Sequence, residues 1–159
     1  MKLLLFVSLL FTTNFQRRDL TKDFETYCNA RFGYCIDYPT FLIPNPESEN
    51  GDGRVFVNKE GTKVLTVYGR LNQDVDGNPV SLKRQYTLDI ENLALSKAKI
   101  TYQKLGKNFY VLSGEKNNRI FYQKMIAKKN SYCYSILEYN KLAKDVYGAV
   151  SVTIFKSFN

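Results

Sequence analysis

The sequence predicts an α+β domain, in which an antiparallel sheet of about six to seven strands carries helices on its faces. Four β-rich segments between residues 99 and 140 follow one another, joined by short polar turns, a spacing typical of consecutive antiparallel strands. Two other segments, 81–95 and 140–159, place apolar residues at helical spacing. No linker, repeat or low-complexity tract divides the 159 residues, so we expect one domain over residues 31–159.

Residues 1–16 are predicted to be a signal peptide. Lys2 precedes an apolar run from Leu3 to Phe11 that only Ser8 interrupts. The run is too short to span a bilayer, which takes about 20 residues, but it suits the apolar core of a signal peptide. The alternative is a buried N-terminal strand or helix. We therefore expect export to a periplasm or out of the cell, and no membrane span in the rest of the chain.

The segment that follows, residues 17–30, is polar and is expected to be a loose lead-in or a short helix. Alternate apolar residues then predict a strand that Pro39 ends. Two β-rich runs, 54–58 and 63–70, flank the turn "KEG" and predict a hairpin. Three glycines are assigned to structural turns, because glycine tolerates positive φ: Gly51, Gly53 and Gly61.

Two helices complete the predicted order of elements. Ser81 is a suitable N-cap for the first, and the apolar stripe behind it consists of Leu82, Tyr86, Ile90, Leu93 and Ala94. Asn140 is a suitable cap for the second. The β-branched run 150–155 leaves a final strand open there, but the cap and the longer stripe favour a helix.

Three cysteines leave the disulfide pairing open. In an oxidising compartment two of them can pair. A bridge from Cys28 or Cys35 to Cys133 closes a long loop, and Cys35–Cys133 is the candidate pair. A direct Cys28–Cys35 bridge needs a turn between the two residues, and three buried free thiols are the alternative to any bridge.

The residue types argue against most enzyme chemistry. The chain has no histidine, which removes Ser-His-Asp and Cys-His catalysis and His-ligated zinc. It also lacks a CxxC motif, a phosphate-binding loop and GxGxxG. We therefore expect no enzymatic activity, no catalytic residues and no cofactor.

Two acidic loops are candidates for a calcium or small-ligand site, with Glu47, Glu49 and Asp52 in one and Asp74 and Asp76 in the other. Calcium takes about six to eight oxygen ligands, often from carboxylates. The second loop resembles the start of an EF-hand, but its glycine comes early and the later glutamate is missing. Turn chemistry is therefore the favoured interpretation of both loops.

The chain is basic, with a net charge of +8, and most of its positive residues lie in the second half. This charge suits an acidic protein, an anionic membrane face or a nucleic acid, but no Lys/Arg block is dense enough for a nucleic-acid tract. We expect a protein partner. Tyrosines beside lysines on strands are the candidate contact residues: Tyr102, Lys104, Tyr122 and Lys124. The alternative packs these aromatic rings under the helices and leaves the lysines in water.

The segments "YCNARFGYCIDYP" and "ENGDGRVFVNKEGTKVLTVYG", with the closing Ser157 and Phe158, resemble a group of small exported bacterial proteins of uncharacterised function. That group has the PsbP-like α/β/α sandwich, which a photosystem II extrinsic subunit and a Ran-binding nuclear import factor share. The resemblance is specific over residues 27–69 and extends to 158 at the level of the fold. It implies a binding protein rather than an enzyme. Some exported proteins with this fold are immunity proteins that neutralise a toxin, so immunity is the most concrete form of the expected function.

Overall fold

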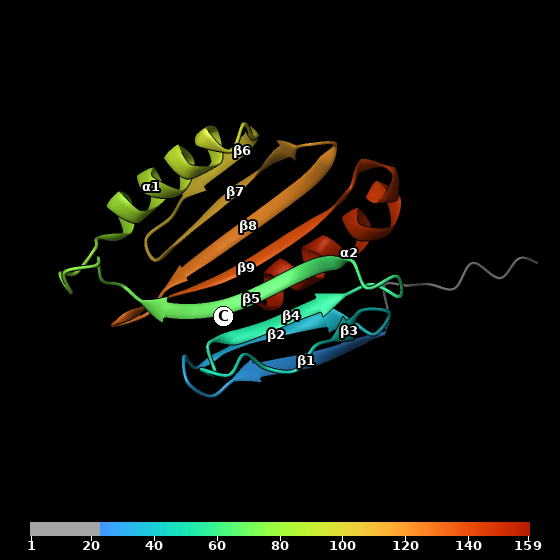
Figure 1. The fold of residues 1–159 in the computed structure, drawn as a ribbon, viewed down its shortest axis with the longest axis horizontal. Coiled ribbons are helices and arrows are strands. Elements are labelled where there is room, and N and C mark those ends of the chain that lie inside the picture. Colours follow the sequence, from blue (N-terminus) through green and yellow to red (C-terminus); the bar gives the residue numbers. More distant parts are fainter. Residues whose placement is uncertain (1–22) are drawn as a thin grey trace, which may run out of the picture.

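The computed structural model describes residues 23–159. The predicted signal peptide lies outside the described residues. Nine strands and two helices make up the fold (Figure 1). The strands are β1 (Phe24–Asn29), β2 (Tyr34–Pro39), β3 (Ile43–Pro44), β4 (Gly53–Val57), β5 (Lys63–Leu71), β6 (Lys99–Leu105), β7 (Phe109–Lys116), β8 (Arg119–Ala127) and β9 (Ser131–Asn140). The helices are α1 (Leu82–Leu95) and α2 (Lys144–Ser157), the latter preceded by a 3-10 turn, Lys141–Ala143.

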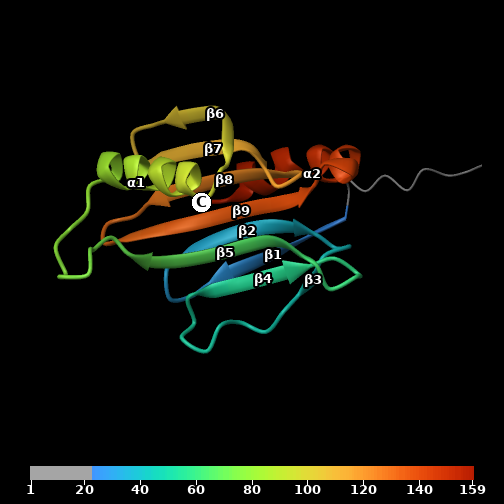
Figure 2. The ribbon, with the colours of Figure 1, turned by 45° about the horizontal axis from the view of Figure 1, so that its top comes forward.

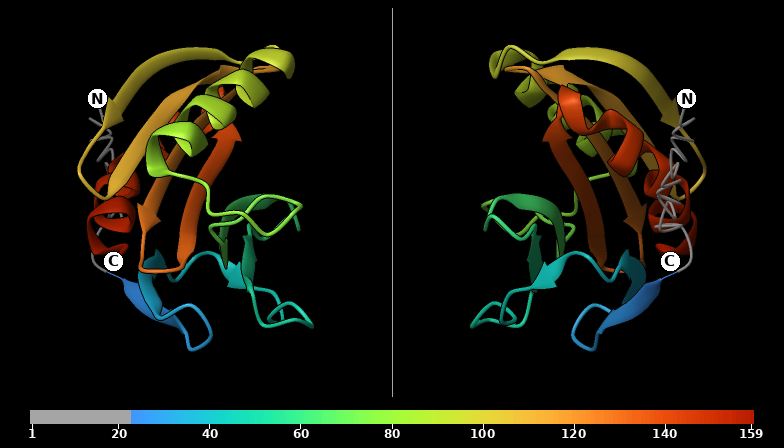
Figure 3. Two further views of the ribbon diagram at one scale, coloured as in Figure 1. Left: turned by 90° about the vertical axis from the view of Figure 1, so that its left-hand side faces the viewer. Right: turned by 90° about the vertical axis from the view of Figure 1, so that its right-hand side faces the viewer.

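Seven strands form one antiparallel sheet in the order β3-β4-β5-β9-β8-β7-β6, and β1 and β2 form a separate hairpin. The two helices lie on opposite faces of the sheet (Figure 3). The hairpin lies alongside β4 and β5 (Figure 2), where the rings of Tyr27 and Phe56 meet with centroids 6.0 Å apart. The sheet therefore has one face covered by α1 and another covered by α2 and the hairpin, which we call the α1 face and the α2 face.

The α1 face is held by aromatic packing and a polar network. Ser81 accepts a hydrogen bond from the backbone N–H of Arg84 and so caps α1, as predicted. Under the helix, Tyr110 and Met125 are fully buried. The carboxylate of Asp89 on α1 accepts hydrogen bonds from Tyr110 and Gln123, which ties the helix to β7 and β8.

The α2 face holds the larger core. Its fully buried residues come from the hairpin, from the sheet and from α2 and the segment after it: Tyr34, Ile36, Phe56, Leu65, Val67, Leu137, Val150, Ile154 and Phe158. Burying each large apolar side chain contributes about 1.5–3 kcal/mol. The ring of Phe158 meets that of Tyr34 edge to face at 5.6 Å, so the end of the chain is packed against β2.

The sequence predicted much of this architecture correctly. The structure confirms the α+β class, the four-strand meander β6–β9, the β4–β5 hairpin and both helices. The C-terminal segment is α2 and not a final strand. The expectation of a loose lead-in or short helix through residue 30 is wrong for residues 24–29, which form β1. Only Tyr27 and Asn29 of this strand are buried, so its sequence carries little apolar alternation.

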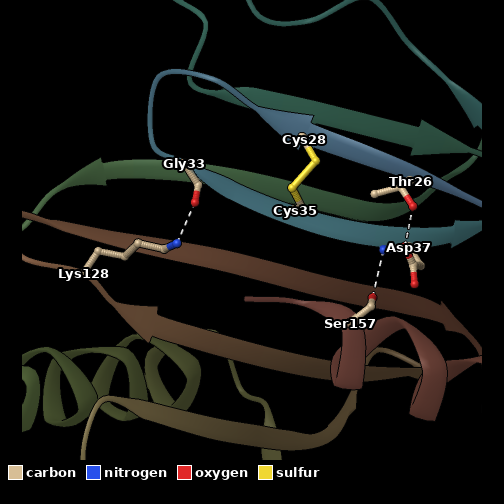
Figure 4. Close-up of a disulfide and its surroundings, with 7 residues drawn as sticks. All are labelled: Thr26, Cys28, Gly33, Cys35, Asp37, Lys128 and Ser157. Atoms are coloured by element: carbon tan, nitrogen blue, oxygen red, sulfur yellow. Dashed lines mark hydrogen bonds between the residues drawn. A yellow bond between two sulfur atoms is a disulfide. The ribbon is translucent and has the colours of Figure 1, made fainter.

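The disulfide joins Cys28 to Cys35, and the predicted Cys35–Cys133 pairing is wrong (Figure 4). Residues 30–33 form the turn that a direct bridge needs, with Gly33 at φ +62°. The hairpin register then sets Cys28 opposite Cys35, with Cα atoms 4.1 Å apart. Cys133 is a buried free thiol on β9, and burial raises its pKa.

Candidate functional site

Basic residues dominate the part of the chain that forms β6, β7 and β8. From residue 97 to residue 129 the sequence holds one acidic residue, Glu115, which pairs with Lys141. The same stretch holds nine basic residues: Lys97, Lys99, Lys104, Lys107, Lys116, Arg119, Lys124, Lys128 and Lys129. A sheet edge with so few carboxylates has a positive potential that favours negatively charged partners.

Five of these lysines gather at one end of the sheet. The turn between β6 and β7 and the turn between β8 and β9 lie at that same end, because Phe109 pairs with Ile126 in the β7–β8 register. The backbone N–H of Ala127 donates to the carbonyl of Asn108 at 2.7 Å, which joins the two turns. We call this region the basic end. Its lysines are Lys104, Lys107, Lys124, Lys128 and Lys129.

A pocket of about 610 Å³ opens at the basic end. The residues that line it come from both turns, from β8 and from the end of the chain: Asn108, Phe109, Lys124, Ile126, Ala127, Lys128, Lys129, Phe158 and Asn159. Phe158 and Ile126 are 1% and 8% exposed, so they form a fixed apolar floor. The pocket thus combines an apolar floor with three ammonium groups.

The lysines of this pocket are held by neutral groups rather than by carboxylates. Lys124 Nζ donates to the carbonyl oxygens of Phe155 and Phe158, at 2.7 and 2.8 Å, where α2 ends. Lys128 Nζ donates to the carbonyl oxygen of Gly33 at 2.6 Å (Figure 4). Within residues 23–159, no carboxylate lies within salt-bridge distance of Lys124, Lys128 or Lys129. None of the three ammonium groups therefore forms a salt bridge within the described part of the chain.

Burial lowers the pKa of Lys124, because a half-buried ammonium loses hydration. Its Nζ also lies 5.9 Å from the centroid of the Phe158 ring, and Lys104 Nζ lies 5.9 Å from that of Phe109. Each contact is within the range of a cation–π interaction. Two lysines are therefore held over two aromatic rings at the same end of the sheet.

The four residues predicted to contact a partner share the α2 face. Register pairs Tyr102 with Ser113 and Ser113 with Tyr122, and it pairs Lys104 with Val111 and Val111 with Lys124. Tyr102 is 52% exposed and Lys104 is exposed. Tyr122 is half-buried and packs against the rings of Tyr139 and Phe155, so it supports α2 instead of offering a free surface.

The acidic loop at 47–52 uses two of its three carboxylates within the protein. Glu47 accepts hydrogen bonds from the hydroxyl of Tyr27 and the side-chain amide of Asn29. Asp52 pairs with Arg31 at 2.7 Å and accepts from Asn50. Glu49 is exposed. These carboxylates hold the loop against β1 and the turn that follows it.

The loop at 74–78 is a turn built on Asp74. This carboxylate accepts hydrogen bonds from the backbone N–H groups of Asp76 and Asn78, at 3.0 and 2.8 Å. The bond from Asn78 lowers the pKa of Asp74. Nowhere in residues 23–159 do three or more His, Cys, Asp or Glu side chains gather closely enough to hold a metal ion.

The glycines assigned to turns divide into two kinds. Gly51 and Gly61 have φ of +68° and +76°, as turn positions that favour glycine require. Gly53 instead begins strand β4, so the turn assignment is wrong for this residue. A Cβ there would lie 2.0 Å from the carbonyl oxygen of Val67, so Gly53 allows β4 to approach β5.

Sequence reasoning did not find the pocket itself. Its lining comes from three segments that are distant in sequence and that meet only when α2 returns the end of the chain to β8. The one local signal was the adjacent Lys128 and Lys129 in a turn. In residues 23–159 no helix is both long enough and apolar enough to cross a membrane.

No family model matches the chain, and no curated protein matches it. Among solved structures, the solution structure of cyanobacterial PsbP (CyanoP) from Synechocystis sp. PCC 6803 is similar, with a TM-score of 0.59 and 14% sequence identity. The match covers 86% of this chain and 92% of the cyanobacterial one. At this identity the likeness concerns the fold alone. The chain therefore has the PsbP-like fold, as the sequence resemblance implied.

Proposed function

We propose that this protein is an exported, non-enzymatic binding domain that engages an acidic protein partner through the basic end of its sheet. The observation that carries the proposal is the group of lysines at the pocket, none of which forms a salt bridge with a carboxylate of residues 23–159. Complementary charge across an interface speeds association and selects partners. A toxin that the protein neutralises is the most concrete form of such a partner.

The charge of the whole chain supports the same proposal. With a net charge of +8 the protein attracts acidic surfaces over a distance of about 8–10 Å at physiological salt. The absence of histidine removes the commonest general base at neutral pH. Binding is therefore a better use of this surface than catalysis.

The test is capture of the partner by tagged protein from the periplasmic or secreted fraction of the native cells, followed by reconstitution with the purified partner. The informative variant is Lys128→Glu/Lys129→Glu, and Lys83→Glu/Lys99→Glu is the matched control, because Lys83 and Lys99 are exposed and do not line the pocket. We expect the pocket variant to lose the partner and the control to retain it. Equal binding by both variants, or no protein partner at all, would contradict the proposal.

The immunity form of the proposal has its own test. Cells that produce the captured partner are compared with and without this protein. If the partner is a toxin, growth is expected to return with the wild-type protein and with the control variant, but not with Lys128→Glu/Lys129→Glu. A partner with no effect on growth would remove the immunity form and leave the binding function in place.

A further inference from the structure

We propose that the pocket at the basic end holds an acidic peptide segment of the partner. In this arrangement a carboxylate lies on the lysines and a neighbouring large apolar side chain lies on the floor of Phe109, Ile126 and Phe158. The inference rests on the proposed function, which it deepens by naming the chemistry of the bound segment.

The size and lining of the pocket suit a short segment and not a single ion. Its volume of about 610 Å³ lies within the range of about 300–1,000 Å³ that is usual for small-ligand sites. Ile126 and Phe158 are almost fully buried beneath it. An aromatic or aliphatic side chain placed here would remove its own apolar surface and part of the half-buried ring of Phe109 from water, which an inorganic ion cannot do.

The ammonium groups of the pocket lysines have N–H donors that form no hydrogen bond within residues 23–159. An ammonium group has three N–H donors. Lys124 uses two on backbone carbonyls and Lys128 uses one, and no hydrogen bond from the Lys129 ammonium is formed within residues 23–159. A carboxylate can accept the remaining donors and also neutralise charge. Because burial lowers the pKa of Lys124, a bound anion would also stabilise its charged form.

Charge decides between the possible occupants. Residues 15–22 of the sequence include Arg17, Arg18 and Lys22 against one acidic residue, so their charge does not complement that of the basic end. A second copy carries the same net charge of +8. The pocket contains no arginine, the residue that matches a phosphate with two parallel hydrogen bonds, so a nucleic acid fits it less well than a peptide carboxylate.

The probe is the acetylated and amidated hexapeptide SFEEFS, titrated into the protein in a calorimeter at low salt. Two control peptides are used. In SFQQFS, glutamine replaces both glutamates and removes the charge at similar shape. In SAEEAS, alanine replaces both phenylalanines and removes the aromatic rings at equal charge. We expect each control peptide to bind at least about tenfold more weakly than SFEEFS. Equal binding of SAEEAS and SFEEFS would mean that charge alone acts, and it would overturn the inference. Tighter binding of a single-stranded oligothymidylate would also overturn it.

Variants assign the binding to the pocket. Lys129→Gln and the double variant Lys128→Gln/Lys129→Gln should each lower the affinity for SFEEFS. The double variant should lower it by about tenfold. Lys83→Gln/Lys99→Gln loses the same charge elsewhere and should change the affinity by less than about twofold. The exposed Lys129 is tested alone because Lys128 also bonds to Gly33. Equal losses in the two double variants would overturn the inference.

The two proposals can fail separately. If a partner is captured and Lys128→Glu/Lys129→Glu loses it, but SFEEFS binds no more tightly than its control peptides, the proposed function stands and the peptide inference fails. If SFEEFS binds in the pocket but no protein partner is found, the pocket chemistry is supported and the proposed function is not.

Discussion

The two faces of the sheet are closed by different means. On the α1 face, Asp89 accepts hydrogen bonds from Tyr110, Gln123 and Gln85, and Gln85 in turn accepts one from Arg70. On the α2 face, the hairpin and α2 close the sheet chiefly by aromatic packing. The α1 face thus adds a network of side-chain hydrogen bonds to its aromatic packing, whereas the α2 face relies mainly on apolar packing.

This difference explains where a binding site can form. The polar groups on the α1 face satisfy one another, so a ligand there would have to displace hydrogen bonds that already exist. On the α2 face, α2 ends beside the β6–β7 and β8–β9 turns, where Lys124 donates only to the backbone carbonyls of Phe155 and Phe158. The basic end retains free donors and an apolar floor, and it is there that we place the partner.

The largest expected effect is the loss of an aromatic ring from the α2-face core. Phe56 is fully buried and contacts the rings of Tyr27 and Tyr38. Phe56→Ala should lower the free energy of unfolding by about 3–5 kcal/mol. Tyr102→Ala, at an exposed position, should change it by less than about 0.5 kcal/mol. Urea unfolding measures both, and a loss below about 1 kcal/mol for Phe56→Ala would show that the hairpin is not part of the core.

Loss of the disulfide should have the next largest effect. The bond closes the β1–β2 hairpin, which belongs to no larger sheet. Cys28→Ser/Cys35→Ser should lower the free energy of unfolding by about 2–3 kcal/mol, chiefly because the unfolded chain gains conformational entropy when the cross-link is removed. Thermal melting with and without a reductant provides the check. The reductant should destabilise wild type and Cys133→Ala alike but leave the double serine variant unchanged, and an effect that required Cys133 would contradict the observed pairing.

Changing the polar network of the α1 face should cost somewhat less. In Asp89→Asn, an NH₂ group replaces one of the two carboxylate oxygens. At least one of the donors Gln85, Tyr110 and Gln123 therefore loses its acceptor. An unsatisfied buried group costs about 1–3 kcal/mol. Glu91→Gln, at an exposed position of the same helix, is the matched control. Hydrogen exchange should show faster opening of α1 in Asp89→Asn alone, and equal exchange in both variants would contradict a fixing role for the network.

The smallest effect concerns Lys124 and has a defined sign. Its pKa is lower in the folded protein than in the unfolded chain, so the unfolded chain binds more protons between these two pKa values. Wild type should therefore gain stability relative to Lys124→Met as the pH rises from the lowered pKa towards 10.5, the ordinary value. Comparing the two proteins cancels the contribution of buried tyrosines such as Tyr34, Tyr68 and Tyr110, whose pKa values burial raises. A difference that is constant with pH would mean that Lys124 is fully hydrated.

The parts of the fold that could be predicted are those encoded by local patterns. Ser81 with the stripe behind it marks α1, and short polar turns mark the meander. Strand β1 was missed because its residues show no regular apolar alternation: Tyr27 and Asn29 are buried, and Glu25, Thr26 and Cys28 are exposed. The disulfide was missed because it depends on the register of a hairpin whose first strand had not been recognised.

The candidate site could be predicted only in part, for the same reason. Lys104 and Lys124 were named from their places beside tyrosines, and the structure sets them in register through Val111. The pocket depends on β8, two turns and the end of the chain meeting in space, and Phe158 becomes part of its floor only through α2. No local pattern encodes such a meeting.

The most direct test of the central claim is a map of backbone amide chemical shifts in the full-length protein, titrated with the SFEEFS peptide. If the basic end is the binding site, the largest shifts should fall at Phe109, Lys128 and Lys129, with little change around Asp89 on the α1 face. Shifts that centre on α1, or that spread evenly over all exposed lysines, would contradict the claim.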